Sequence, residues 1–383
     1  MSNCKKPNII FLIPGPIYKA DLPNFKDKFA MLSENFKGEI YSWSCEERFE
    51  NYNMGSFVYR GLNAGIQGFV KKQSLIKHII SNAIRYHKQK KVDVIVCYDP
   101  IFTGVIGFVL KIFLGVKLII EINSAEIGGS IAQHYSYSWW VCLKDWAARR
   151  LSFFVLRFAD GIKFLSVVSK GNMPKWMMRK RIFYFHDFVP THYFHPDLLN
   201  QSNQIILSVG FPFYLKGMDV LISAYQKILV QYPNLKLLLI GHKLETDAKE
   251  YFKDLPGSVM IFPGMYYDKL KEYFQDCYAC VLASRTEGMG RVLIEAMASG
   301  KPVIGSNVGG IPGVIQDGRN GFLFESENVD DLADKLDKLL SDPELAKSMG
   351  IEGRNIVKEK FSSEKYMECF KHMIDFVLNK EDR

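Results

Sequence analysis

Two glutamates, Glu287 and Glu295, flank a glycine-containing turn in the stretch SRTEGMGRVLIEAMASG. The preceding ACVLAS is typical of a buried strand, and RVLIEAMASG is typical of a helix that ends at Gly300. Glycines at a strand-to-helix turn let backbone N–H groups approach an anion closely, and the helix N-terminus adds partial positive charge. The stretch therefore predicts a phosphate-binding turn with a carboxylate on each side.

The two carboxylates are expected to reach different parts of one ligand. Glu295 lies about one turn into the helix, where a carboxylate can accept two hydrogen bonds from a vicinal diol such as that of ribose. Glu287 precedes the turn, so its expected target is a hydroxyl of the group that the phosphate carries. The phosphate itself is expected at Gly288, Met289 and Gly290. A capped surface helix with incidental acids is the alternative that these residues leave open.

A second strand–turn–helix pattern, SVGFPFYLKGMDVLI over 208–222, places Lys216 at the start of a helix. A lysine there opposes the helix dipole, which supports an anionic partner such as a diphosphate, and a solvated side chain is the alternative left open. Other phosphate signatures are missing, because Leu293 stands where the dinucleotide fingerprint has its third glycine and no P-loop occurs. The sequence also lacks a D-x-D triplet, a common way to hold a metal–diphosphate.

The first half of the chain alternates apolar runs with helical stretches, which is typical of a parallel, doubly wound α/β sheet. Its expected strands are 7–14, 91–99, 116–123 and a strand-like segment at 159–171. The apolar window 101–122 contains Lys111, Gly115 and Lys117, whereas a transmembrane helix needs about 20 apolar residues with few charges. We therefore expect a helix, a glycine stop and a buried strand there.

The second half repeats this alternation, and 383 residues are enough for two domains. Its expected strands are 204–210, 235–241, 259–264, 279–284 and 301–306, with an amphipathic helix at 218–233. The polar, proline-marked stretch 190–204 is the best linker candidate. The pattern predicts two Rossmann-like domains with parallel doubly wound sheets facing across a cleft, where ligands tend to bind.

The order LKGMDVLI, EGMGRVLIEAMASGKPVI and GGIPGVIQDGRNGFLF resembles glycosyltransferase family 4, the retaining sugar-nucleotide transferases of the GT-B fold. The resemblance covers roughly 204–361 and is mainly topological over 1–200. It implies an acceptor-side N-terminal domain at 1–195, joined by the C-terminal helix 363–383, and a donor-binding domain at 196–362.

The resemblance also implies a role for each matching residue. Glu295 would bind the ribose, Glu287 would face the donor sugar, and Lys216 would neutralise the leaving diphosphate. The other implied donor contacts are Gly15, Asn123, Gly210, Met265, Gly288, Met289, Gly290, Arg291 and Val292. Relatives need neither a metal nor another cofactor, because basic side chains and helix ends take the charge.

Three positions depart from the family pattern. Phe211 stands where many relatives have an arginine, Asn123 where many have a histidine, and Gly313 where a glutamate is common. The diphosphate thus has one cation fewer, for which Arg291 and Lys170 are candidate substitutes. A nucleotide-sugar-binding protein with little activity therefore stays open beside the enzyme.

Charge is unevenly distributed along the chain. Residues 1–200 hold 27 Lys and Arg against 15 Asp and Glu, whereas 201–383 hold 22 against 26. Apolar residues recur at helical spacing over 136–158 with basic residues on other faces, which favours a core helix over a membrane contact. The stretch KGNMPKWMMRKR at 170–181 is either a membrane contact or a solvated loop. A basic first half suits an anionic surface, so an acceptor linked to a membrane lipid is expected. Nucleic acid is not an expected partner.

The cysteines and histidines do not indicate a disulfide framework or a metal site. The seven cysteines are scattered and no secretory signal is visible, so a reduced cytoplasmic compartment is expected, with attachment to the inner face of the plasma membrane as an option. Cys277 and Cys280 are expected in the core, and His186, His192 and His195 are not expected to bind metal.

Together these observations predict a retaining hexosyltransferase that uses a UDP- or GDP-linked sugar. The expected acceptor is a lipid-linked glycan of cell-surface polysaccharide or lipopolysaccharide synthesis, and a soluble acceptor is the alternative.

Overall fold

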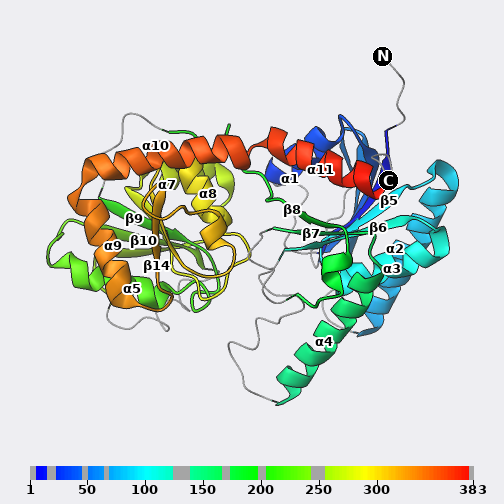
Figure 1. The fold of residues 1–383 in the computed structure, drawn as a ribbon, viewed down its shortest axis with the longest axis horizontal. Coiled ribbons are helices and arrows are strands. Elements are labelled where there is room, and N and C mark those ends of the chain that lie inside the picture. The colour runs from blue at the N-terminus through cyan, green and yellow to red at the C-terminus, as the bar shows by residue number, and fades with distance from the viewer. Residues whose placement is uncertain are drawn as a thin grey trace. The chain divides into compact units, whose positions relative to one another are not determined.

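The computed structural model describes residues 6–14, 23–44, 51–63, 69–123, 139–165, 173–196, 204–242 and 255–378. They form two compact units, each described by itself below (Figure 1). The first unit holds the described residues of 6–165, 173–185 and 366–378, and the second holds 186–365. The division falls at Phe185 and His186, ten positions before the expected end of the N-terminal domain at 195. The helix α11 (Ser363–Val377) belongs to the first unit from Tyr366 onward.

Within the described residues, the first unit is built on an eight-stranded sheet of order β3-β4-β2-β1-β5-β6-β7-β8. All neighbours pair in parallel except β3 and β4, which are antiparallel. The strands are β1 (Asn8–Leu12), β2 (Lys37–Ser44), β3 (Asn51–Met54), β4 (Phe57–Asn63), β5 (Val94–Cys97), β6 (Lys117–Ile122), β7 (Gly161–Phe164) and β8 (Ile182–Tyr184). The predicted strands at 7–14, 91–99, 116–123 and 159–171 are thus confirmed as β1, β5, β6 and β7.

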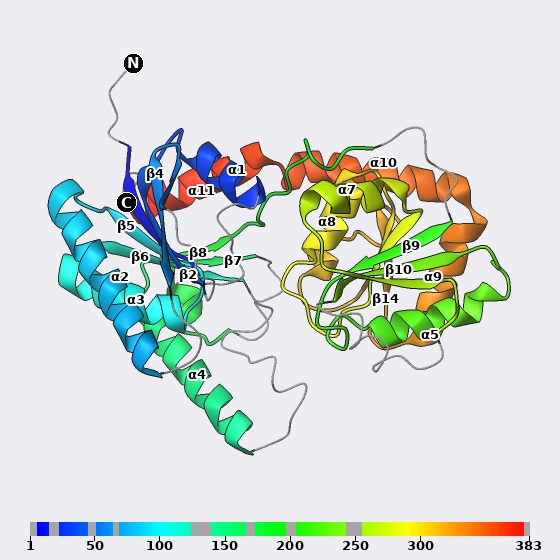
Figure 2. The same ribbon diagram turned by 180° about the vertical axis from the view of Figure 1, so that it is seen from behind.

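Helices cover both faces of this sheet (Figures 1 and 2). The helices are α1 (Pro23–Leu32), α2 (Phe69–Lys90), α3 (Phe102–Leu114), α4 (Trp139–Phe158), the short η3 (Met177–Arg179) and α11. Because side chains alternate along a strand, Ile10 and Leu12 face the core under α2 and α3. Phe11 points the other way, with its ring centroid 5.0 Å from that of Phe29 on α1 and 6.0 Å from that of Phe370 on α11.

The apolar window 101–122 folds as predicted. The helix α3 ends at Gly115, which adopts φ 68° and donates its N–H to the carbonyl oxygen of Lys111, and β6 follows. Only glycine takes this left-handed conformation readily, so the glycine stops the helix and permits the turn into the strand. Among the described residues, no helix has the length and apolar character needed to cross a bilayer.

A buried ion pair joins β6 to β7 inside the first unit. Glu121 and Lys163 are paired across the two strands, and Nζ lies 3.3 Å from Oε2, with both side chains fully buried. The Lys163 ammonium also lies 4.7 Å from the ring centroid of Phe185 and 5.4 Å from that of Tyr366 on α11. A buried charge needs such partners because it has lost its water.

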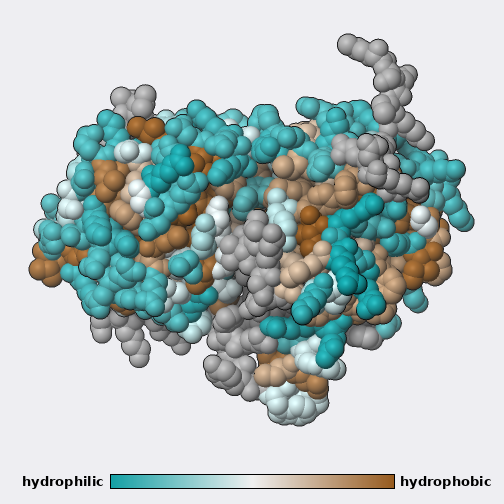
Figure 3. Space-filling view, in the orientation of Figure 1, coloured by the Kyte–Doolittle hydropathy of each residue, from teal (hydrophilic) through white to brown (hydrophobic). Residues whose placement is uncertain are grey.

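The helix α4 buries Val155 and Leu156, but the apolar face that was predicted to lie in the core is largely exposed, so the prediction of a core helix at 136–158 was wrong for that face. Trp139, Trp140, Trp146 and Phe154 are each more than half exposed. The described helix extends away from the sheet of its unit (Figure 1), and pale and brown side chains gather over its free end in Figure 3. Helical spacing of apolar residues shows that they share a face, but not whether another element covers that face.

Within the described residues, the second unit has a six-stranded, fully parallel sheet of order β11-β10-β9-β12-β13-β14. Its strands are β9 (Ile205–Val209), β10 (Lys236–His242), β11 (Val259–Pro263), β12 (Ala279–Leu282), β13 (Val303–Ser306) and β14 (Gly321–Phe324). Its helices are α5 (Met218–Leu229), α7 (Tyr267–Asp276), α8 (Arg291–Ala298), η4 (Ile311–Gly313), α9 (Val329–Ser341) and α10 (Pro343–Lys360). All five strands predicted for this half are confirmed, as is the doubly wound fold class.

Candidate functional site

Two chemically active side chains meet at the carboxyl edge of the second sheet. Lys216 stands in the turn after β9, and Glu287 stands in the turn after β12. These strands are parallel neighbours, so both turns leave the same edge of the sheet. The Lys216 Nζ lies 2.6 Å from Oε2 of Glu287, and the side chains are 22% and 16% exposed.

The carboxylate of Glu287 is held by two further donors. The hydroxyl of Ser284 donates to Oε2 at 3.3 Å, and the backbone N–H of Gly288 donates to Oε1 at 3.2 Å. Ser284 is itself fixed, because the Ser306 hydroxyl donates to its carbonyl oxygen at 2.6 Å. The acid is therefore held in one position on the turn before a ligand arrives.

Glycines make the close backbone approaches that bring these turns together. Gly217 precedes α5 at φ 60°, and a Cβ there would lie 1.9 Å from the carbonyl oxygen of Ala283. Gly309 has φ 52°, and a Cβ there would lie 2.0 Å from the carbonyl oxygen of Glu287. A side chain at either position would push the turns apart.

Arg285 ties the two turns together. Its guanidinium makes a bidentate pair with Asp219 in the first turn of α5, at 2.8 and 2.7 Å, and its Nε donates to Glu327 at 2.8 Å. The hydrogen bond to Asp219 is the main cause that raises the pKa of Arg285 above its ordinary value. The turn bearing Glu287 is thus locked to the helix that follows Lys216.

Glu295 lies in the first helical turns of α8 and is 3% exposed. Its Oε1 accepts hydrogen bonds from Arg291 Nε at 2.9 Å and from the Tyr267 hydroxyl at 3.1 Å. Burial raises the pKa of Glu295, and Arg291 and Tyr267 oppose that rise. Burial, followed by the charge of Glu295, raises the pKa of Tyr267 as well, so its hydroxyl keeps its proton.

Oε2 of Glu295 has no hydrogen-bond partner in the part of the chain that the structure describes, and Nη2 of Arg291 is buried without one. Each atom retains hydrogen-bonding capacity that a polar ligand can use. A carboxylate oxygen and a guanidinium nitrogen side by side suit a ligand that carries both hydroxyl and anionic groups.

The other predicted contacts of this unit lie on the turns at the same edge. Gly210 follows β9, and the side chain of Lys216 packs over it, since a Cβ there would lie 3.0 Å from Lys216 Cγ. Gly290 caps α8 at φ 76°. The remaining residues are the half-buried Met265 after β11, the buried Met289, and the half-buried Gly288 and Val292.

Two predicted contacts belong to the first unit. Asn123 follows β6, its Nδ2 donates to the carbonyl oxygen of Tyr98 at 3.1 Å, and its buried Oδ1 has no partner among the described residues. Gly15 lies outside the described residues, as does Lys170, one of the two substitutes suggested for the missing cation. The other substitute, Arg291, is engaged with Glu295.

Phe211 is 48% exposed at the carboxyl edge and brings no charge to it. Cys277 and Cys280 are buried in the core, as predicted. Arg285, Ser284 and Tyr267 were not predicted as parts of the site. Arg285 is adjacent to the acidic turn, but nothing in the sequence points to its partners 66 and 42 positions away.

Comparison with known proteins shows which family the second unit resembles. Residues 192–356 match the family model of the glycosyl transferases group 1. An uncharacterised glycosyltransferase of Haemophilus influenzae is 33% identical over 181 residues, which cover 46% of this chain and 50% of that protein. N-acetyl-alpha-D-glucosaminyl L-malate synthase of Bacillus anthracis is 34% identical over 182 residues, 47% of each protein. The chain spans about half the length of these curated relatives.

Solved structures share the fold over nearly the whole chain. Sucrose-phosphate synthase from Thermosynechococcus elongatus superposes with a TM-score of 0.81 at 18% identity, covering 98% of this chain and all of that one. HepE of Anabaena, solved with UDP and glucose, superposes with a TM-score of 0.72 at 16% identity, covering 96% of this chain and 99% of that one. The second unit therefore resembles the group 1 glycosyl transferases, and the chain shares the GT-B fold of these solved structures.

Proposed function

We propose that this protein is a retaining glycosyltransferase that moves a hexose from a UDP- or GDP-linked donor to a glycan acceptor. The observation that carries the proposal is the Lys216–Glu287 ion pair at the carboxyl edge of the second sheet, with the buried Glu295 on the helix that follows. A structural relative supports it, because HepE of Anabaena was solved with UDP-glucose. Several relatives with named activities are sugar transferases or synthases.

Each residue has a task that its surroundings suit. The free Oε2 of Glu295 would accept hydrogen bonds from the ribose diol, while Arg291 and Tyr267 hold Oε1. The turn at Gly288–Gly290 precedes α8, whose N-terminus favours a phosphate. Glu287 would accept a hydrogen bond from a hydroxyl of the donor sugar, and Lys216 would pair with the diphosphate.

The free protein neutralises Lys216 with Glu287, so a donor must compete for both groups. A diphosphate offers Lys216 a stronger anionic partner, and a sugar hydroxyl offers Glu287 a donor in exchange. Donor binding would therefore replace the internal ion pair by two contacts to the ligand. This exchange ties recognition of the sugar to recognition of the phosphates.

The proposed chemistry follows the charge. Breaking the bond between the anomeric carbon and the phosphate oxygen leaves negative charge on the diphosphate and positive charge on the sugar ring. Lys216 and the N-terminus of α8 would stabilise the diphosphate. The acceptor hydroxyl would attack from the face that the diphosphate leaves, and the leaving phosphate would take its proton. No metal and no other cofactor is part of this proposal.

Phe211 is the feature that argues most against efficient sugar transfer. It leaves Lys216 as the cation in the turn after β9, because Arg291 is held by Glu295. A chain that binds nucleotide sugars with little turnover is the second candidate function, and Phe211 is the observation that favours it.

Donor binding is tested first by calorimetric titration with UDP-glucose and GDP-mannose. Lys216→Met should weaken donor binding roughly 10- to 150-fold, because a hydrogen bond to a charged group contributes about 1.5–3 kcal/mol. The matched control is Lys227→Met on α5, whose half-exposed lysine pairs with Asp330 on the surface. Equal affinities of wild type and Lys216→Met would contradict the assignment, as would binding of neither nucleotide sugar.

Turnover separates the enzyme from the binding protein. Wild type should release UDP or GDP in the presence of a glycan acceptor, and Glu287→Ala should abolish that release. If wild type binds a donor yet neither hydrolyses it nor transfers its sugar across a panel of lipid-linked and soluble glycans, the binding function replaces the transferase.

We further propose that the acceptor is lipid-linked and that the first unit contacts an anionic membrane on its inner, cytoplasmic face. Trp139 and Trp146 on α4 are 62% and 57% exposed, and Phe154 and Phe158 continue the same stripe at 51% and 42%. The guanidinium of Arg150 lies 5.3 Å from the ring centroid of Trp146. Aromatic side chains interleaved with cations suit the boundary between lipid headgroups and acyl chains.

Vesicle flotation tests the membrane contact. The protein should float with vesicles containing phosphatidylglycerol at low salt and detach at high salt, since each basic residue near the surface contributes about 1 kcal/mol, roughly a fivefold change. Replacing Trp139 and Trp146 with serine should abolish flotation. The matched control is Val230→Ser, directly after α5, which removes a 90%-exposed apolar side chain elsewhere. Salt-insensitive flotation, or none, would overturn the proposal.

A further inference from the structure

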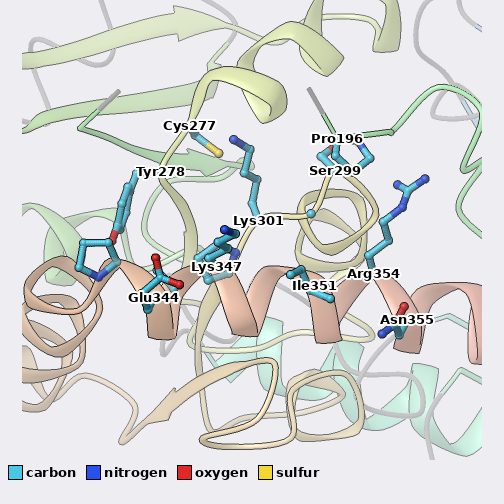
Figure 4. Close-up of a pocket in the computed structure, with 14 residues that line it drawn as sticks. Pro196, Cys277, Tyr278, Ser299, Lys301, Glu344, Lys347, Ile351, Arg354 and Asn355 are labelled. Atoms are coloured by element: carbon cyan, nitrogen blue, oxygen red, sulfur yellow. The ribbon is translucent and has the colours of Figure 1, made fainter. Parts of the chain in front are cut away.

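A second candidate site lies at the opposite edge of the second sheet. A cavity of about 320 Å³ opens at the amino ends of β12 and β13, whereas Lys216 and Glu287 lie beyond the carboxyl ends. Its walls are the residues before β12, the turn between α8 and β13, and one face of α10 (Figure 4). The volume is at the lower end of the range for small-molecule pockets, about 300–1,000 Å³.

Lys301 brings a buried, unpaired charge to this cavity. Its side chain lines the cavity, is 8% exposed, and makes no hydrogen bond or ion pair with any residue that the structure describes. Figure 4 shows its ammonium beside the sulfur of Cys277. Burial raises the pKa of Cys277 to about 12, so this thiol stays neutral and gives Lys301 no counter-charge. An ammonium that faces a cavity without a counter-ion retains hydrogen-bonding capacity that an anionic ligand can use.

Two further cations line the same cavity from α10. Lys347 is exposed and has no ion-pair partner among the described residues. Arg354 uses Nη1 to donate to the carbonyl oxygens of Ala298 and Phe194, and no carboxylate pairs with it in the described part of the chain. Burial lowers the pKa of Arg354. Glu344 is the one acidic side chain among the lining residues, so the lining has a net charge of about +2.

The cavity is built into the packing of the unit. A Cβ at Gly350 on α10 would lie 2.1 Å from the carbonyl oxygen of Gly300, so the helix and the turn touch through their backbones. The Tyr278 hydroxyl donates to the carbonyl oxygen of Leu339 at 2.8 Å, which holds its ring as one wall. Other apolar walls come from Pro196, Pro302, Pro343, Ala346 and Ile351.

We propose that this cavity binds a phosphate group, supplied either by a small phosphorylated metabolite or by inorganic phosphate. Lys301 and Lys347 would hold the phosphate oxygens, and the net charge of the lining, to which Arg354 contributes from another part of the cavity, matches a dianion (Figure 4). The apolar walls leave room for an organic body beyond the phosphate. The site is independent of the proposed transferase activity, because it shares no residue with the donor site.

Calorimetric titration of the full chain tests this proposal with three probes: inorganic phosphate, glucose 6-phosphate and unphosphorylated glucose. We expect both phosphates to bind and glucose not to. Tighter binding of glucose 6-phosphate identifies an ester as the ligand, and equal binding identifies the phosphate alone. Because glucose 6-phosphate resembles part of a sugar nucleotide, the titration is repeated with Lys216→Met, in which binding at the amino edge should persist.

Substitutions assign the binding to the cavity. Lys301→Met should weaken phosphate binding roughly 10- to 100-fold and, without phosphate, should raise the melting temperature by removing the unpaired charge. Lys347→Met, on an exposed position that cannot disturb folding, should weaken binding about two- to fivefold. The control is Lys358→Met, an exposed lysine of α10 outside the cavity lining. The proposal is overturned if wild type binds neither phosphate, or if both cavity variants bind like wild type.

Discussion

Replacing Lys163 with methionine should destabilise the first unit more than any exposed charge substitution. The change leaves the carboxylate of Glu121 fully buried and without its counter-ion. Its Oε1 already has no hydrogen-bond partner among the described residues, so none of these residues compensates for the lost ammonium. The substitution also removes the ammonium that faces the rings of Phe185 and Tyr366.

The expected loss follows from the burial of both partners. Breaking a buried ion pair by removing one side costs about 3–5 kcal/mol. A domain of this size loses about 2–4 °C in melting temperature for each kcal/mol, so the transition of the first unit should fall by about 6–20 °C. The double variant Glu121→Leu/Lys163→Met should lie near wild type or above it, because a buried pair replaced by apolar residues is often neutral or stabilising by about 1–4 kcal/mol.

Scanning calorimetry of the full chain measures these transitions, and hydrogen exchange of the β6 and β7 amides assigns them to the first unit. The control is Lys117→Met, because Lys117 pairs with Asp160 at 3.8 Å on the surface and is 38% exposed. Its loss should stay below about 1 kcal/mol. If the losses of Glu121→Leu and Lys163→Met simply added in the double variant, the two charges would not be coupled and the reasoning would fail.

Three further predictions concern the second unit. Gly217→Ala should lower the free energy of unfolding in urea by about 2 kcal/mol or more, because residue 217 has φ 60° and its Cβ would lie 1.9 Å from a carbonyl oxygen. Gly257→Ala is the control and should be nearly neutral, because its Cβ would have no atom within 4 Å. Arg285→Lys should lose its bidentate pair with Asp219 and speed hydrogen exchange of the turn at 285–290, and unchanged exchange would contradict the clamp. Burial raises the pKa of Glu295 above 4.5, so the folded chain binds this proton more tightly than the unfolded chain. The stability of wild type relative to Glu295→Gln should therefore be greatest below pH 4.5 and decline as the pH rises through the folded-state pKa, and a flat difference would refute it.

Central strands with unbroken apolar runs were predictable, whereas strands with mixed sequences and most edge strands were not. IIFL in β1 and ACVL in β12 are buried along their length, as central parallel strands must be. The strands β2, β3, β4, β8 and β14 were missed. Three of them, β3, β8 and β14, lie at sheet edges, and β3 reads NYNM, which carries little apolar signal. Edge strands need burial on fewer sides, so their sequences are less constrained.

The meeting of Lys216 and Glu287 was predictable in outline, because turns after neighbouring parallel strands share one edge. Their direct ion pair was not, since a ligand was expected between them. The hydrogen bond of Tyr267 to Glu295 and the clamp of Arg285 on Asp219 join side chains 28 and 66 positions apart. Such pairings depend on how helices sit on the sheet, which periodicity does not reveal.

The helix α11 closes a core whose first strand is made at the other end of the chain. Its buried residues are Tyr366, Phe370, Met373, Ile374 and Val377. Phe370 stacks on Phe11 and packs against Phe36, although about 360 residues of synthesis separate it from Phe11. The ribosome therefore releases every residue of the second unit before the first unit can bury its aromatic face. Removal of the segment from Tyr366 onward should therefore leave the aromatic face of the first unit uncovered and prone to aggregation.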